Sequence, residues 1–252
     1  MVITKHFLAD KLGIDFEIAQ FFADRKVPAN NLYWKNKFLY VTYGTGYLFL
    51  PIIYDMLYKS GIDKKKLLEE NRIQNMEKAF HFVAAFEAKE INFEDYIYQF
   101  ILLFREGAVH KKFFDDLIRY FRNETCQYYS LGTSIDALNR ADAFLFTICD
   151  LEMEEIAFRN LLLRWYHTAA SILILDDMVD WEDDKVHQEE NAIIELGNDK
   201  QAVLRVKSIL ETNLQAIQNF NPVLAGFLQK IYDKAIEDQP IKGILESQEP
   251  QE

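Results

Sequence analysis

Apolar residues recur at a helical spacing along almost the whole chain, and this periodicity constrains its fold most. Val206, Leu210, Leu214 and Ile217 follow one another at steps of three or four residues, as on one face of an α-helix. No stretch alternates polar and apolar residues for long enough to indicate a strand. The pattern therefore predicts an all-α fold, with helices over 4–24, 31–59, 72–89, 93–105, 108–129, 134–148, 152–183, 199–219 and 222–236.

Few residues in this sequence favour tight turns. The 252 residues include 9 glycines and 5 prolines, well below average usage. Sandwiches and barrels need many tight turns, so the composition argues against them. No stretch resembles a domain linker. We expect one helical domain over residues 1–236 and an acidic, frayed tail over 237–252.

Two of the predicted helices are apolar almost all round, which is typical of helices at the centre of a bundle. One includes Phe38–Tyr58 and the other Ile156–Leu175. The chain also holds 20 Phe, 13 Tyr and 3 Trp. These aromatic residues predict either a bulky core or the wall of a cavity for an apolar ligand.

Charge, cysteine content and the N-terminal sequence narrow the class of protein. A net charge of −12 argues against a non-specific nucleic-acid binder, which needs a basic surface. Cys126 and Cys149 alone form no disulfide framework, and they fit a reduced, cytoplasmic setting. The N-terminus lacks the pattern of a signal peptide. The longest apolar stretches are too short to span a bilayer, so we expect a soluble chain without stable membrane insertion.

The most informative segment is an acidic cluster that directly follows an apolar run. Residues 176–184 contain six acids. On a helical wheel Asp177, Asp180, Asp183 and Asp184 lie within about 100° of Asp176. The same face continues toward the N-terminus with three substrate-binding candidates, which are Trp165, Ala169 and Leu173. One helix face thus changes from apolar to strongly anionic.

Helical propensity does not explain this arrangement. Like charges four residues apart repel, and the C-terminal end of a helix favours cations. A bound Mg²⁺ ion would explain it, because Mg²⁺ takes one or two carboxylates and completes its octahedron with water and phosphate oxygens. An apolar wall that leads to such an ion suits a substrate with a hydrocarbon body and a diphosphate head. The alternative is a solvated acidic helix end.

At these residues the sequence resembles the class I isoprenoid synthase superfamily, particularly the trans-polyprenyl diphosphate synthases. Asp176, Asp177 and Asp180 match the three aspartates of the family's second aspartate-rich motif, DDxxD. The stretch from Asp142 to Phe146 is similar to a KTAALF-like phrase that precedes that motif. The resemblance covers about residues 135–200, and the rest of the chain is similar in helical pattern only.

The resemblance implies a single-domain antiparallel helical bundle around a central apolar cavity, and a Mg²⁺-dependent enzyme that ionises or transfers an allylic prenyl diphosphate. It implies that Asp176 and Asp180 are catalytic metal ligands, and that Asp177 binds a metal water or a second ion. Asp184 is a further metal candidate. Arg140 and Lys185 are candidates for binding diphosphate. A homodimer or a partner synthase is also implied as possible.

The sequence departs from the family pattern at several positions. Leu173 replaces the Gln before the motif, and Arg140 replaces the Lys of the KT pair. No first aspartate-rich motif is present in the N-terminal half. Glu87 and Glu90 form either a degenerate version of it or a solvated helix end, and the NSE pattern of terpene cyclases is absent. The competing hypothesis is therefore a catalytically reduced relative that serves as a partner subunit or binds an apolar ligand.

A di-iron helical bundle is the main all-α rival. Such a bundle needs two Glu-x-x-His motifs. None of the five histidines has a glutamate three positions before it. The sequence therefore does not fit that class.

Overall fold

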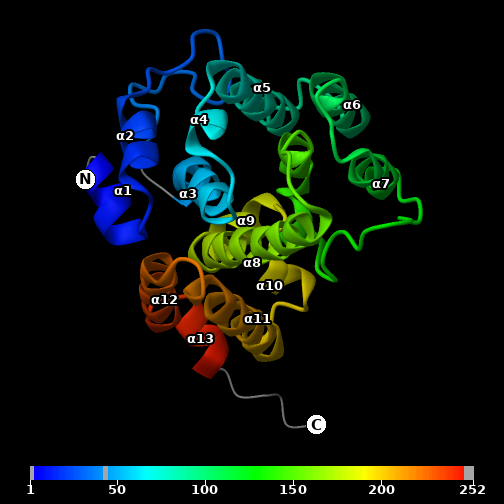
Figure 1. Ribbon diagram of the computed structural model, residues 1–252. Helices are drawn as coiled ribbons and strands as arrows, with labels where there is room; N and C mark the ends of the chain where they lie inside the picture. The colour runs from blue at the N-terminus through cyan, green and yellow to red at the C-terminus, as the bar shows by residue number, and fades with distance from the viewer. Residues whose placement is uncertain (1–2, 42–44, 247–252) are drawn as a thin grey trace.

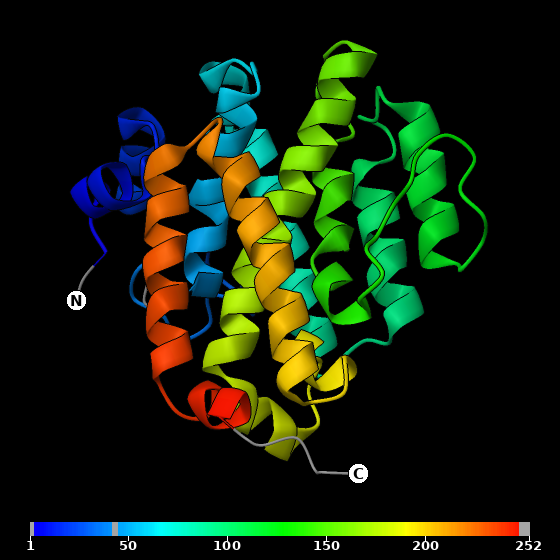
Figure 2. The ribbon, with the colours of Figure 1, turned by 90° about the horizontal axis from the view of Figure 1, so that it is seen from below.

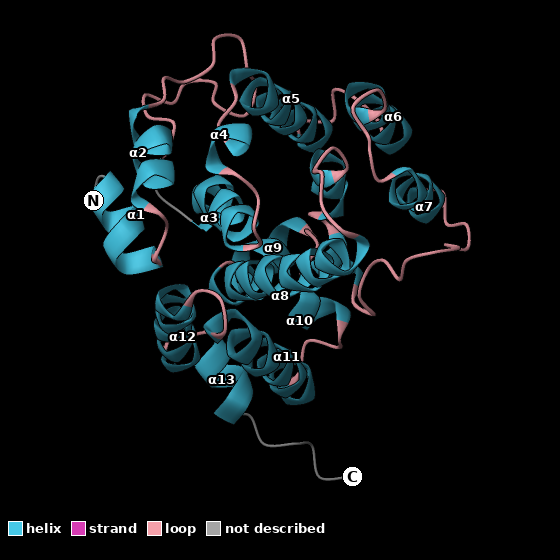
Figure 3. Cartoon of the chain, in the orientation of Figure 1, coloured by secondary structure: helices cyan, strands magenta, loops and turns pink. Residues whose placement is uncertain are grey.

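The computed structural model describes residues 3–41 and 45–246, and all regular structure within these residues is helical, as predicted (Figure 3). Its elements, in chain order, are α1 (Lys5–Leu12), α2 (Phe16–Asp24), α3 (Thr45–Lys59), α4 (Lys64–Leu67), α5 (Glu70–Glu87), α6 (Phe93–Phe104), α7 (Lys111–Phe121), the 3-10 helices η1 (Asp136–Asn139) and η2 (Asp142–Ile148), α8 (Glu155–Val179), α9 (Trp181–His187), α10 (Ala192–Glu195), α11 (Lys200–Gln218), α12 (Pro222–Glu237) and α13 (Ile241–Glu246).

The 25-residue helix α8 lies at the centre of the bundle, as its apolar sequence predicts (Figure 1). It packs against α3, α11 and α12. Seen from below, α11 and α12 run beside it, while α5, α6 and α7 lie on its other side (Figure 2). Because its buried residues lie on most of its circumference, α8 contributes to the core on both sides.

The predicted helix over 4–24 is divided at Gly13, where α1 ends in a left-handed cap with a φ of 63°. A Cβ at this position would lie 2.5 Å from Asn221 Oδ1 and 2.7 Å from Val223 Cβ. Only glycine therefore permits both this turn and the close approach of α12.

The predicted helix over 31–59 was wrong in its first part. Helix α3 begins at Thr45, and residues 31–41 form a loop, which leaves Phe38 97% exposed. Trp34 anchors this loop, because its ring stacks on Tyr40 and its Nε1 donates a hydrogen bond to the Tyr40 carbonyl oxygen at 3.1 Å. Residues 42–44 of the predicted helix lie outside the described residues.

Two other predicted helices differ in extent or type. The helix over 108–129 ends at Phe121, since the buried Asp116 carboxylate accepts backbone hydrogen bonds from Gln127, Tyr128 and Tyr129 and folds the chain back. The segment 134–148 forms η1 and η2 rather than an α-helix. Within the segment predicted as a tail, α13 is helical and Ile241 is buried.

Candidate functional site

The acidic segment spans two helices that meet at Asp180. Helix α8 ends at Val179 and α9 begins at Trp181. The Asp180 N–H donates to the Asp176 carbonyl oxygen, and the Asp184 N–H donates to the Asp180 carbonyl oxygen, each at 2.9 Å. The predicted helix over 152–183 is therefore interrupted at Asp180, while its hydrogen bonding continues across the junction.

The aspartates of the DDxxD motif differ in environment. The Asp176 side chain is 42% exposed and lies 3.7 Å from Arg140 Nη2. Asp180 is exposed. Asp184 is partly exposed, and its Oδ2 accepts a hydrogen bond from Asn191 Nδ2 at 2.8 Å. Three of the four predicted metal ligands thus retain solvent access at one end of the bundle.

Asp177 is buried and takes part in the local structure. Its carboxylate accepts hydrogen bonds from Arg140 Nη2 at 2.6 Å and from the Ala192 N–H at 2.8 Å. Its carbonyl oxygen accepts a third from Asn191 Nδ2. Burial raises the pKa of Asp177 to about 6, while Arg140 opposes that shift. These bonds join the end of α8 to η1 and to the start of α10.

Arg140 is held in place beside the acidic cluster. Its Nη1 donates to the Ala137 carbonyl oxygen at 2.7 Å, while Nη2 bonds Asp177. The Glu195 carboxylate accepts the N–H groups of Asp136 and Ala137 at 2.9 and 2.8 Å, which fixes η1 against α10. The remaining N–H groups of a guanidinium are donors suited to phosphate oxygens.

Carboxylates from several elements act on Asp180. Partial desolvation raises its pKa, and Asp176, Asp184, Asp183 and Glu189 raise it further. Partial desolvation and neighbouring like charges both disfavour the ionised form of a carboxyl group.

Glu87, at the end of α5, belongs to the same region. Desolvation raises its pKa, Glu189 raises it further, and Lys37 opposes the shift. Glu189 thus influences both Glu87 on α5 and Asp180 at the end of α8. The fold brings Glu87, one member of the acidic pair of α5, within electrostatic range of Glu189, which sequence spacing alone did not establish.

The acidic region is not a preformed metal cage. Among residues 3–41 and 45–246, no three His, Cys, Asp or Glu side chains are arranged to hold a metal ion. Mg²⁺ commonly binds through only one or two carboxylates plus water and phosphate. Asp176 and Asp180 fit that donor set, whereas Asp177 already has its hydrogen bonds to Arg140 and Ala192.

The apolar candidates on α8 lie deeper in the bundle. Trp165 and Ala169 are buried and Leu173 is partly buried. The ring centroids of Phe80 and Phe144 are 4.4 Å apart, and Phe49 packs edge-on against Trp165 at 5.8 Å. A void of about 10 Å³ remains among these rings, enough for about one water molecule.

Lys185 lies on α9, where its Nζ is 4.7 Å from the centre of the Trp181 ring. The Lys185 ammonium group therefore makes a cation–π contact with the Trp181 ring. Lys185 is exposed.

Sequence reasoning missed a buried carboxyl at Asp142. Its Oδ2 accepts hydrogen bonds from Tyr120 at 3.0 Å and from Tyr166 at 3.4 Å. Burial raises its pKa to about 7, an effect that the two tyrosines oppose. The signal in the sequence was a single acid within an apolar stretch, where a charged side chain requires partners.

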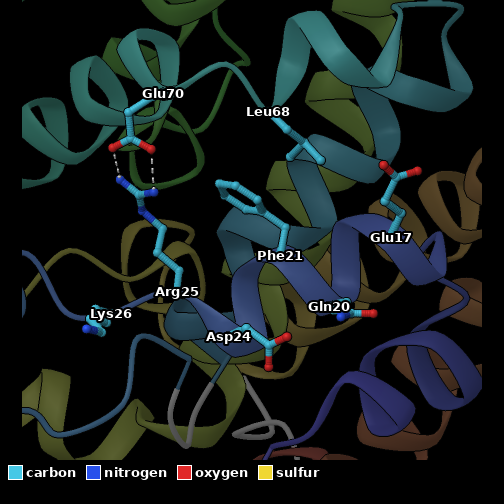
Figure 4. Close-up of a pocket in the computed structure, with 8 residues that line it drawn as sticks. All are labelled: Glu17, Gln20, Phe21, Asp24, Arg25, Lys26, Leu68 and Glu70. Atoms are coloured by element: carbon cyan, nitrogen blue, oxygen red, sulfur yellow. Dashed lines mark hydrogen bonds and ion pairs between the residues drawn. The ribbon is translucent and has the colours of Figure 1, made fainter.

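A larger surface depression lies elsewhere, between α2 and the segment from α4 to α5 (Figure 4). Its volume is about 740 Å³, and Phe21 lies between the Arg25–Glu70 ion pair and Glu17. None of the residues that the sequence singled out as site candidates lines it.

No protein-family model, curated protein or solved structure matches this chain. Within the described residues, no helix has the length and apolar character needed to cross a bilayer. The case for a function therefore rests on the residues themselves.

Proposed function

We propose that this chain is a Mg²⁺-dependent enzyme of the isoprenoid synthase type, which binds an allylic prenyl diphosphate at the C-terminal end of α8. The observation that supports it best is the crowding of carboxylates from α8, α9 and the following segment around Asp180, beside Arg140. Such crowding is unfavourable without a cation, and a divalent ion would relieve it.

In this proposal Asp176 and Asp180 hold the metal, Asp184 is a further candidate, and water and diphosphate oxygens complete the coordination. Bound Mg²⁺ would supply positive charge to a departing diphosphate. Arg140 meets the diphosphate with its unused N–H groups, and Asp177 positions Arg140 through their 2.6 Å hydrogen bond. Trp165, Ala169 and Leu173 face the hydrocarbon part of the substrate.

The filled interior favours a second candidate, in which the chain is a catalytically reduced partner subunit. A prenyl chain is far larger than the 10 Å³ void beside Trp165. The enzyme would therefore need the rings of Phe49, Phe80 and Phe144 to move apart when substrate binds. A partner subunit would need no such movement.

The deciding experiment incubates the purified chain with geranyl, farnesyl and geranylgeranyl diphosphates and Mg²⁺, and analyses the organic extract by mass spectrometry. We expect a product that disappears in the Asp176→Asn, Asp180→Asn double variant. Glu182→Gln is the matched control, because Glu182 is an exposed acid of the same segment on another face.

Two outcomes would count against the enzyme. One is turnover that survives the double variant unchanged. The other is no turnover together with no Mg²⁺-dependent binding of inorganic diphosphate by calorimetry. If the isolated chain shows no turnover but turnover appears when a second synthase is added, the result would support the partner subunit instead.

A further inference from the structure

The short helix α10 connects the acidic segment to the segment that carries Arg140. It packs against α8, η1 and α11 (Figure 1). Its N-cap is Asn191 and its last residue is Glu195. Asn191 bonds the acidic segment and Glu195 bonds η1, so the two ends of α10 reach the two halves of the candidate site.

Asn191 is 2% exposed, and both polar atoms of its amide form hydrogen bonds. Its Nδ2 donates to the Asp177 carbonyl oxygen and to Asp184 Oδ2, each at 2.8 Å. Its Oδ1 accepts the N–H groups of Ile193 and Ile194, which caps α10. No other donor in the described part of the chain bonds the Asp184 carboxylate. Asn191 therefore restrains one oxygen of Asp184 and leaves the other for a cation.

Glu195 fixes the opposite end of α10 to η1. Its carboxylate accepts the Asp136 N–H at 2.9 Å and the Ala137 N–H at 2.8 Å. The carbonyl oxygen of the same Ala137 accepts a hydrogen bond from Arg140 Nη1 at 2.7 Å. Ala137 thus links Glu195 to the guanidinium of Arg140, whose other N–H groups suit phosphate oxygens.

From these contacts we infer that α10 is the positioning element of the site, with a separate task at each end. Asn191 positions Asp184 for a divalent cation. Glu195 positions Arg140 for an anion such as diphosphate, and it does so through η1. Both are positioning residues, because each acts through another side chain and neither touches the ligand. The inference deepens the proposed function and rests on it, since it requires that a cation and an anion bind at this end of the bundle.

The cation half is tested with Asn191→Ser, which keeps a capping oxygen for α10 but is too short to reach Asp184. Binding of Mn²⁺ without diphosphate is measured from the electron paramagnetic resonance signal of the free ion. We expect the affinity to fall about 10-fold, because partners that orient a metal ligand commonly affect metal affinity by that factor or more. Binding of inorganic diphosphate without metal, measured by calorimetry, should stay unchanged.

Asn221→Ser is the matched control, because Asn221 makes the same kinds of contact at another helix. It is also 2% exposed, and it caps α12 by accepting the Leu224 N–H. Its Nδ2 donates to the Leu12 carbonyl oxygen and to Asp55 Oδ2. Asn221→Ser should lose a similar amount of stability and bind Mn²⁺ as the wild type does. A loss of affinity caused by instability alone would appear in both variants.

The anion half is tested with Glu195→Gln, which keeps the length of the side chain but offers one acceptor oxygen to two N–H groups. If charge alone mattered, removing a negative charge would strengthen the binding of an anion. The inference predicts the opposite, a fall of about fivefold or more in the affinity for inorganic diphosphate, because η1 is held less firmly. The Mn²⁺ affinity should stay within about twofold of wild type. Asp63→Asn is the control, because Asp63 accepts two backbone N–H groups at the start of α4.

The crossed pattern separates this inference from the proposed function. Weaker Mn²⁺ binding in Asn191→Ser only, with weaker diphosphate binding in Glu195→Gln only, supports the inference. A wild type that binds both ligands, with both affinities unchanged in the two variants, overturns the positioning roles and leaves the proposed function standing. A variant in which both affinities fall alike also overturns them, because that is the result of a general structural defect. A wild type that fails to bind one ligand overturns the inference, and failure to bind either ligand counts against the proposed function as well.

Discussion

Replacing Asp142 by Asn should stabilise the protein at high pH and have little effect at low pH. Asp142 is 1% exposed, and its hydrogen-bond partners are the hydroxyl groups of Tyr120 on α7 and Tyr166 on α8. The Trp165 indole N–H near it has no partner within hydrogen-bond distance in the structure. An asparagine has nearly the same shape, accepts the same tyrosine bonds through its amide oxygen and never ionises.

The magnitude follows from the pKa difference between the folded and unfolded states. Burial raises the pKa of Asp142 from 3.8 to about 7. Between these values the folded state holds a proton that the unfolded state has lost, so the free energy of unfolding falls as the pH rises. Once the pH exceeds 7, the loss for the wild type is about 4 kcal/mol relative to pH 3. Between pH 5 and pH 8 the change amounts to about 3 kcal/mol.

The assay is urea unfolding of the wild type and Asp142→Asn, followed by circular dichroism at several values between pH 5 and pH 8. The stability advantage of the variant should grow by about 3 kcal/mol over that range. Other titrating groups, including Asp177, are present in both proteins and cancel in the difference. A difference that stays constant with pH would refute the reasoning, because it would mean that Asp142 ionises equally in the folded and unfolded states.

Substitutions at three further residues test other parts of the structure by the same unfolding measurement. Gly13→Ala should destabilise by about 1 kcal/mol from its positive φ alone, and by more because Asn221 must move; no loss would show that α12 is not packed there. Asp116→Ala should lower stability by about 3 kcal/mol or more, since three backbone N–H groups lose their acceptor; a loss below 1 kcal/mol would contradict it. Asp177→Ala should destabilise by about 3 kcal/mol and leave Arg140 without its buried partner, whereas Asp177→Asn, which keeps an acceptor, should lose less.

The class of fold was readable from the sequence because helical periodicity records which face is buried. The prediction failed at residues 31–41, where the apolar residues Trp34 and Tyr40 anchor a loop by stacking on each other. An apolar residue is equally suited to a helix core and to a loop anchor, so periodicity does not separate them. The same limit applies to Asp142–Ile148, which lies within the predicted helix over 134–148 but forms a 3-10 helix.

The candidate site was predictable as a region, but the role of each acid was not. Adjacent helical residues point about 100° apart, so Asp176 and Asp177 can meet different surroundings at the edge of a bundle. The structure turns Asp177 inward to Arg140 and the Ala192 N–H, and leaves Asp176 partly exposed. The helix wheel placed them on one face because it contained no information about η1 and α10, the neighbours that select between them.

The different surroundings of these acids follow from the energetics of burial. A buried carboxylate is tolerated only with hydrogen-bond donors, and Asp177 has them from η1 and α10. Those bonds tie the end of α8 to its neighbours, and this in turn fixes where the exposed Asp180 lies relative to Glu189. A carboxylate near the surface keeps the freedom to exchange water for a cation, which a fully bonded one lacks. The motif thus combines an inward acid, Asp177, that holds the end of the bundle together with outward acids that retain solvent access. In the proposed function, substitution of Asp177 should therefore affect stability before it affects the binding of Mg²⁺.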